Sequence, residues 1–142
     1  MAPDPRPLDP RGPRFAAGIT TVVLVLVLVT GSGWLALAQT AAFAFGSYDV
    51  RWNPYSLLYR WLVQPRLGPP ADREDPAPVR FAQRVGLVFL AVATAGYISG
   101  VVAVGVTATA LGLAAAFLNA AFGLCLGCEV YLLLARLRAS RA

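Results

Sequence analysis

Cys125 and Cys128 form the one pair of neighbouring side chains in this sequence that is suited to covalent chemistry. Their C-x-x-C spacing places two side chains about one turn apart on one face of a helix. Such a pair can cycle between a dithiol and a disulfide. The sequence contains no histidine, which is the usual general base and the commonest zinc ligand. The residues beside the cysteines therefore decide which chemistry to expect.

A redox interpretation gives each group near the pair a role. Gly123 and Gly127 permit a helix break, and a helix that begins near Cys125 would stabilise a thiolate there through its N-terminal N–H groups. Cys125 would then be the attacking thiol and Cys128 the resolving one. Glu129 could accept a proton if it were partly buried. These three residues are our candidate catalytic residues, and a persulfide on Cys125 is a chemical alternative.

Two other interpretations of the cysteines stay open. The pair offers two thiolates, whereas a structural zinc ion needs four ligands. A metal site would therefore need Glu129 as a third ligand or the cysteines of a second copy. Alternatively, Cys125 and Cys128 only fill small gaps in a lipid-buried helix, as free cysteine often does. We expect no bound cofactor, and whether the protein is an enzyme stays open.

The elements that position the pair are predicted by an unusually apolar composition. Of the 142 residues, 58% are hydrophobic and 13% are charged, against about 25% charged in soluble proteins. The apolar residues concentrate in two blocks, so we expect an all-α membrane protein surrounded by lipid. All 12 basic residues are arginine and flank these blocks. This arrangement favours anionic lipid over nucleic acid as the partner of the positive charge.

Four transmembrane helices are expected, arranged as two hairpins. The first hairpin is assigned to residues 13–48. If its apolar part formed one continuous helix, that helix would be about 51 Å long, too long for a single crossing of a bilayer core of about 30 Å. Gly31-Ser32-Gly33 supplies the turn. The second hairpin, residues 81–135, turns at Ser99-Gly100 and carries the C-x-x-C pair.

The remaining segments are polar. Residues 1–12 are rich in proline and predicted to be a disordered lead-in. Residues 49–80 hold a proline-rich linker and a short helix, which Asn53-Pro54 starts and Pro65 ends. Its Trp, Tyr and Arg content is typical of a helix in the headgroup region. Residues 136–142 form a basic tail.

The two hairpins resemble each other, which suggests that they arose by duplication. Arg14-Phe15-Ala16 matches Arg80-Phe81-Ala82, and Ser32-Gly33 matches Ser99-Gly100. Parallel repeats of this kind occur in membrane folds.

A separate pattern, in which small residues recur every four positions, predicts a smooth helix face for close packing. It comprises Ala108, Gly112, Ala116 and Ala120.

The arginines also predict the orientation. Neither turn carries a charge, so the positive-inside rule places both termini and residues 49–80 in the cytoplasm. We therefore expect a multi-pass protein of the cell inner membrane, with Cys125 and Cys128 at its cytoplasmic edge.

With these motifs assembled, the sequence resembles a family of small bacterial membrane proteins catalogued as domain of unknown function 4395. The resemblance covers nearly the whole chain after the lead-in and rests on four motifs: Asp9-Pro10-Arg11-Gly12-Pro13-Arg14-Phe15, Arg66-Leu67-Gly68-Pro69-Pro70, Arg80-Phe81-Ala82-Gln83 and Phe122-Gly123-Leu124-Cys125-Leu126-Gly127-Cys128-Glu129. It brings no assigned catalytic residues. Its members look to be associated with sulfur-transfer and thioredoxin-like proteins, which implies sulfur or thiol chemistry.

Two functional hypotheses follow. In the first, Cys125 and Cys128 handle thiol redox or sulfane sulfur together with a soluble thioredoxin-like or sulfurtransferase partner. In the second, the chain is a non-enzymatic membrane scaffold or a small permease component. Four short helices leave little room for a pore, so transport would require a homo-oligomer. The first predicts dependence on the sulfurs, and the second predicts dependence on helix contacts.

Overall fold

The computed structural model describes residues 6–141, and its regular structure there is helical. In chain order the elements are α1 (Arg11–Thr30), α2 (Gly33–Tyr48), the 3-10 helix η1 (Val50–Trp52), α3 (Pro54–Leu58), the π-helix η2 (Tyr59–Val63), α4 (Gln64–Leu67), α5 (Pro76–Ser99), α6 (Val102–Phe122) and α7 (Leu126–Arg141).

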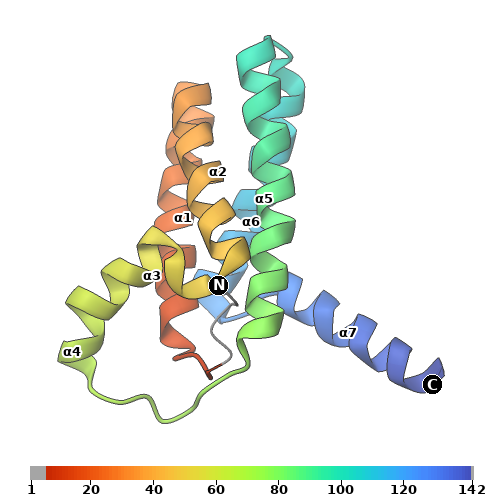
Figure 1. The fold of residues 1–142 in the computed structure, drawn as a ribbon. Coiled ribbons are helices and arrows are strands. Elements are labelled where there is room, and N and C mark those ends of the chain that lie inside the picture. The colour runs from red at the N-terminus through yellow and green to blue at the C-terminus, as the bar shows by residue number, and fades with distance from the viewer. Residues whose placement is uncertain (1–5, 142) are drawn as a thin grey trace.

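The four longest apolar helices form an upright bundle (Figure 1). Helix α1 packs mainly against α6, α2 packs mainly against α5, and α5 packs against α6. The turns that join α1 to α2 and α5 to α6 lie at one end. The opposite end carries residues 6–14, the segment 49–75 and the start of α7, and is called the polar end below.

Three helices are long and apolar enough to cross a membrane, namely α1, α5 and α6. This finding indicates a multi-pass membrane protein. Helix α2 has 16 residues and is shorter than the roughly 20 that usually span a bilayer core.

Local capping explains where these helices begin and end. The hydroxyl of Ser32 accepts a hydrogen bond from the N–H of Leu35 at 3.1 Å and caps α2. The carboxylate of Asp75 accepts from the N–H of Ala77 at 2.8 Å, and Pro76 occupies the first turn. Helix α5 therefore begins at Pro76, earlier than the predicted boundary at residue 81, because this cap and proline already favour a helix.

The segment between the hairpins contains the predicted short helix, with one difference. Asn53 caps α3 through the N–H of Tyr55, and Pro54 stands in its first turn, as predicted. Pro65 does not end the helical path, which runs on to Leu67. The N–H of Gln64 bonds to the carbonyl of Tyr59, five residues back. This wider π turn relieves the clash that a proline ring makes with an α-helical turn.

Residues 6–12 correct the prediction of a disordered lead-in. The backbone of Leu8 pairs with that of Glu74 through hydrogen bonds of 2.7 and 2.9 Å. The side chains of Leu8 and Asp9 are buried, and α1 begins at Arg11. The proline-rich composition favoured disorder, but these long-range contacts order the segment. Residues 1–5 of the predicted lead-in lie outside the described residues.

The core combines apolar packing with a few buried hydrogen bonds. Leu24 and Leu90 belong to its central apolar cluster. A β-carbon at Gly112 would lie 3.5 Å from Leu24, so the small-residue face of α6 serves the packing of α1 against α6. The buried Gln39 amide donates to the hydroxyl of Thr20 at 3.0 Å, which joins α2 to α1.

Candidate functional site

The candidate site lies at the joint between α6 and α7, at the polar end. Helix α6 ends at Phe122 because Gly123 adopts a left-handed conformation with φ of 69°. The N–H of Gly123 bonds to the carbonyl of Asn119 at 2.9 Å, and that of Leu124 bonds to Leu118 at 3.3 Å. This pattern is typical of a glycine-terminated helix. The break that Gly123 predicted is therefore present.

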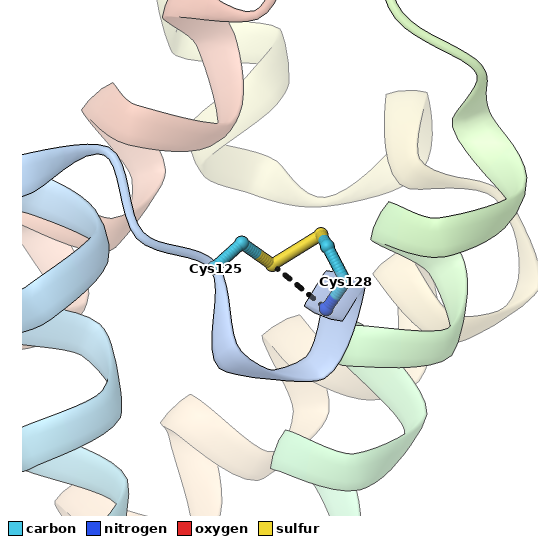
Figure 2. Close-up of a disulfide and its surroundings, with 2 residues drawn as sticks. All are labelled: Cys125 and Cys128. Carbon is cyan, nitrogen blue, oxygen red and sulfur yellow. Dashed lines mark hydrogen bonds between the residues drawn. A yellow bond between two sulfur atoms is a disulfide. The ribbon is translucent and has the colours of Figure 1, made fainter. Parts of the chain in front are cut away.

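Cys125 directly precedes α7, and Cys128 lies in its first turn (Figure 2). The two sulfurs form a disulfide, with the Cα atoms 5.2 Å apart. The N–H of Cys128 donates to Sγ of Cys125 at 3.2 Å, and the carbonyl of Cys125 accepts from the N–H of Glu129 at 3.0 Å. Cys125 thus occupies the capping position of α7, with its sulfur beside the N-terminal N–H groups.

The two cysteines differ in what covers them. Both are partly buried. The side chain of Cys128 packs against a small buried cluster made by Leu8, Val50 and Val79. These three residues come from the N-terminal segment, η1 and the first turn of α5. Cys128 therefore packs against residues from three separate segments of the polar end.

Helix α5 holds the start of α7 in place. A β-carbon at Gly127 would lie 2.6 Å from both Cα and Cβ of Ala82, so glycine permits direct contact between the two helices. One turn further on, the rings of Tyr131 and Phe81 lie 5.7 Å apart. Beyond this contact α7 extends away from the bundle (Figure 1). It continues to Arg141, so the predicted basic tail is helical up to this residue.

The other candidate groups near the sulfurs differ from expectation. The side chain of Glu129 is exposed, so the partial burial expected of a proton acceptor is not seen. No group of three or more potential metal ligands lies together within residues 6–141. The Asn119 side chain, six residues before Cys125, makes no hydrogen bond in the described part of the chain.

Arg14 links the joint to the N-terminal end of α1. Its guanidinium donates to the carbonyl of Ala120 at 3.3 Å and lies beside Gly123. A cation at the carbonyl end of a helix is favoured by the helix dipole. The first motif of the chain therefore stabilises the segment that leads to Cys125.

A second polar cluster at this end was not predicted from the sequence. The buried carboxylate of Asp9 accepts hydrogen bonds from the Arg11 guanidinium at 2.9 Å and from the Tyr59 hydroxyl at 2.8 Å. Gln64 contributes a longer one at 3.5 Å. Burial would raise the pKa of Asp9, but the hydrogen bonds from Arg11 and Tyr59 outweigh it and lower this pKa. Burial and the Asp9 carboxylate raise the pKa of Tyr59 to about 12.

One signal in the sequence could have pointed to this cluster. Asp9 and Arg11 belong to a motif that carries the family resemblance. Their opposite charges are separated in the sequence by one residue, Pro10. Tyr59 and Gln64 lie 50 and 55 residues further along the chain, so their contribution depends on the tertiary fold.

No curated protein and no solved structure matches this chain. A family model matches residues 8–136, a range that includes both the Asp9 cluster and the disulfide. The chain therefore belongs to the family described as Domain of unknown function (DUF4395).

Proposed function

We propose that this protein is a thiol–disulfide exchange protein of the cell inner membrane, in which Cys125 and Cys128 are the reacting groups. One observation carries the proposal: the two sulfurs are joined in a disulfide, and Sγ of Cys125 accepts the N–H of Cys128 at the start of a helix. Donors in this position stabilise a thiolate more than a thiol. A pair that only fills gaps would not need such a partner.

In the proposed topology four helices cross the membrane, and α2 is the shortest of them. The packing supports a duplicated pair of hairpins, because the contact of α1 with α6 has its equivalent in the contact of α5 with α2. A two-fold axis along the membrane normal would exchange these two contacts. The uncharged turns and the arginine-rich polar end support an orientation in which both termini, and the disulfide, lie on the cytoplasmic side.

The exchange requires a partner that supplies two electrons, and a soluble thioredoxin-like dithiol protein has the required chemistry. A thiolate of the partner attacks Sγ of Cys125, which forms a mixed disulfide and releases Cys128 as a thiolate. The second partner thiol then attacks the partner sulfur of the mixed disulfide and releases Cys125. The partner becomes oxidised to a disulfide, and its two protons pass to Cys125 and Cys128.

The assignment of the attacked sulfur rests on packing. Cys128 is covered by Leu8, Val50 and Val79, whereas Cys125 follows the exposed Leu124 in the short connection between α6 and α7. In its reduced state the same pair could pass sulfane sulfur: the Cys125 thiolate attacks the outer sulfur of a sulfurtransferase persulfide, a persulfide forms on Cys125, and the sulfurtransferase thiolate is the leaving group.

Thiol labelling in sealed inner-membrane vesicles tests this proposal. We expect no labelling of the wild-type protein before reduction. After reduction, a membrane-impermeant reagent should label Cys125 and Cys128 only from the cytoplasmic side. In a background with both cysteines replaced by serine, Ser140→Cys should report the cytoplasmic side. Ser99→Cys, at the last residue of α5 and beside the turn to α6, should report the opposite side.

The proposal fails if the reduced cysteines follow the labelling pattern of Ser99→Cys, or if they stay unreactive after reduction in opened vesicles. A direct test runs the exchange in reverse: Cys128→Ser is offered the disulfide form of the partner, Cys125 attacks that disulfide, and the mixed disulfide should be trapped because Cys128 is no longer present to resolve it. Cys125→Ser is the matched control and should trap much less, because the remaining sulfur is covered.

A further inference from the structure

A pocket of about 480 Å³ lies at the polar end, between the N-terminal segment and the helices η1 to α4. Leu8 and Val50 line it, and the same two residues belong to the buried cluster against which Cys128 packs. The pocket and the cluster beside Cys128 therefore share two apolar residues. The exchange chemistry proposed above does not use this space.

The pocket wall is strongly basic. Four arginines contribute to it, namely Arg6, Arg51, Arg60 and Arg73, together with one acidic residue, Asp9. The Asp9 carboxylate already accepts hydrogen bonds from Arg11 and Tyr59, so Arg11 compensates its charge. Asp9 thus does not neutralise Arg60 or Arg73, and a concave basic surface of this kind concentrates anions.

Two of these arginines are held in place by the backbone. The Arg51 guanidinium donates to the carbonyls of Arg6 at 2.6 Å and Pro7 at 3.1 Å. The Arg60 guanidinium donates to the carbonyl of Arg51 at 3.1 Å. A guanidinium has five N–H groups in a rigid fork. The bond that Arg60 makes therefore orients its side chain while other donors remain.

The nearby acidic residues Asp49 and Glu74 do not line the pocket. The carboxylate of Asp49 caps η1 by accepting the backbone N–H of Arg51 at 3.0 Å. Glu74 follows Arg73 and pairs its backbone with Leu8, and burial, followed by the charge of Asp9, raises the pKa of Glu74. The Arg73 side chain is exposed and makes no hydrogen bond within residues 6–141.

We propose that this pocket binds a phosphate-type oxyanion through the guanidinium groups of Arg60 and Arg73, with the Ser56 and Gln64 side chains as further polar groups in the wall. Guanidinium groups bind phosphate through paired, charge-assisted hydrogen bonds. The phosphate group could belong to an anionic lipid at the membrane surface or to a free anion. This inference is independent of the cysteines and goes beyond the exchange reaction.

Binding to the full-length protein tests the proposal and distinguishes the two sources. In a nonionic detergent, the thermal unfolding midpoint is measured against inorganic phosphate, with chloride keeping the ionic strength constant. In a second arm, the protein is reconstituted into nanodiscs of phosphatidylcholine with or without phosphatidylglycerol. A saturable rise in the midpoint with either probe supports the site. Phosphatidylglycerol alone would identify a lipid headgroup, and inorganic phosphate would identify a free anion.

Variants decide whether the response comes from this pocket. Arg60→Gln with Arg73→Gln should weaken the apparent affinity for the active probe by about tenfold or more, the equivalent of one lost charge-assisted interaction. Arg73→Gln alone removes an exposed side chain without a hydrogen bond, so it should fold and still weaken binding. Arg138→Gln, on the exposed part of α7, is the matched control and should respond like the wild type.

The proposal is overturned if neither probe raises the midpoint of the wild type. It is also overturned if Arg73→Gln and the double variant respond as strongly as Arg138→Gln, since the anion would then bind elsewhere. Arg73→Lys provides an independent check, because it keeps the charge but loses the paired geometry and should retain only part of the affinity.

Discussion

Gly127 of α7 lies directly against Ala82 of α5, so close that a β-carbon on Gly127 would sit 2.6 Å from the Ala82 backbone. The contact falls between Cys125 and Cys128 in the sequence. It therefore fixes the helix that carries the disulfide against a helix that is long and apolar enough to cross a membrane.

Gly127→Ala is expected to push α7 away from α5. Overpacking of this kind costs about 1–3 kcal/mol, and the thermal unfolding midpoint in detergent should fall accordingly. Gly18→Ala is the matched control, because nothing lies within 4 Å of a β-carbon there. That substitution should leave the midpoint unchanged or raise it slightly, since alanine favours a helix. Equal effects of the two substitutions would contradict the packing described here.

Gly123 gives a second prediction about the same joint. Its φ of 69° lies in the left-handed region, where a residue with a β-carbon costs about 1–2 kcal/mol. Gly123→Ala should therefore lower the unfolding midpoint, whereas Gly123→Asn should lower it less because asparagine tolerates this conformation. If the alanine variant were as stable as the asparagine variant, strain at the backbone would not be what ends α6.

The helix boundaries could be predicted from the sequence where the signal is local. Ser32, Asn53 and Gly123 cap or end helices through groups within a few residues of themselves, so their chemistry is visible in the chain. Three apolar helices of membrane-spanning length are likewise confirmed, because hydropathy is a property of each segment alone.

Features that depend on distant contacts could not be predicted. The ordering of Leu8 and Asp9 requires Glu74 and Tyr59, which composition does not reveal. The C-x-x-C spacing indicated a possible disulfide. Cys128 packs against Leu8, Val50 and Val79. This contact could not be predicted, because it depends on how three separate segments pack together.

Tyr59 gives a prediction that concerns the polar end and its pH dependence. Tyr59→Phe removes a donor to the buried, charged Asp9, and such bonds contribute about 1.5–3 kcal/mol. The pKa of Tyr59 is raised to about 12, above the value near 10 of an unfolded tyrosine. The stability it provides is therefore complete below about pH 10 and is lost as the pH rises toward 12.

Ultraviolet titration of tyrosinate measures this pKa directly. The group that titrates near pH 12 should be missing in Tyr59→Phe and present in Tyr48→Phe, whose side chain is exposed. Asp9 gives the opposite sign, because its pKa is lowered. Its contribution is present above its unfolded pKa near 3.9 and is lost as the pH falls through the lower folded value. A wild-type protein that lost stability well below pH 10 through Tyr59 would contradict this assignment.

Two tyrosines, Tyr55 and Tyr97, should differ in their response to loss of the hydroxyl. The Tyr55 hydroxyl donates to the amide oxygen of the buried Gln39, so Tyr55→Phe leaves that oxygen without this donor and should cost about 1–3 kcal/mol. The Tyr97 hydroxyl is buried and has no hydrogen-bond partner in the described part of the chain. Tyr97→Phe should therefore leave the unfolding midpoint unchanged or raise it, since no hydrogen bond is lost and a desolvated polar group is removed. A clear loss of stability in Tyr97→Phe would show that its hydroxyl has a partner in the membrane.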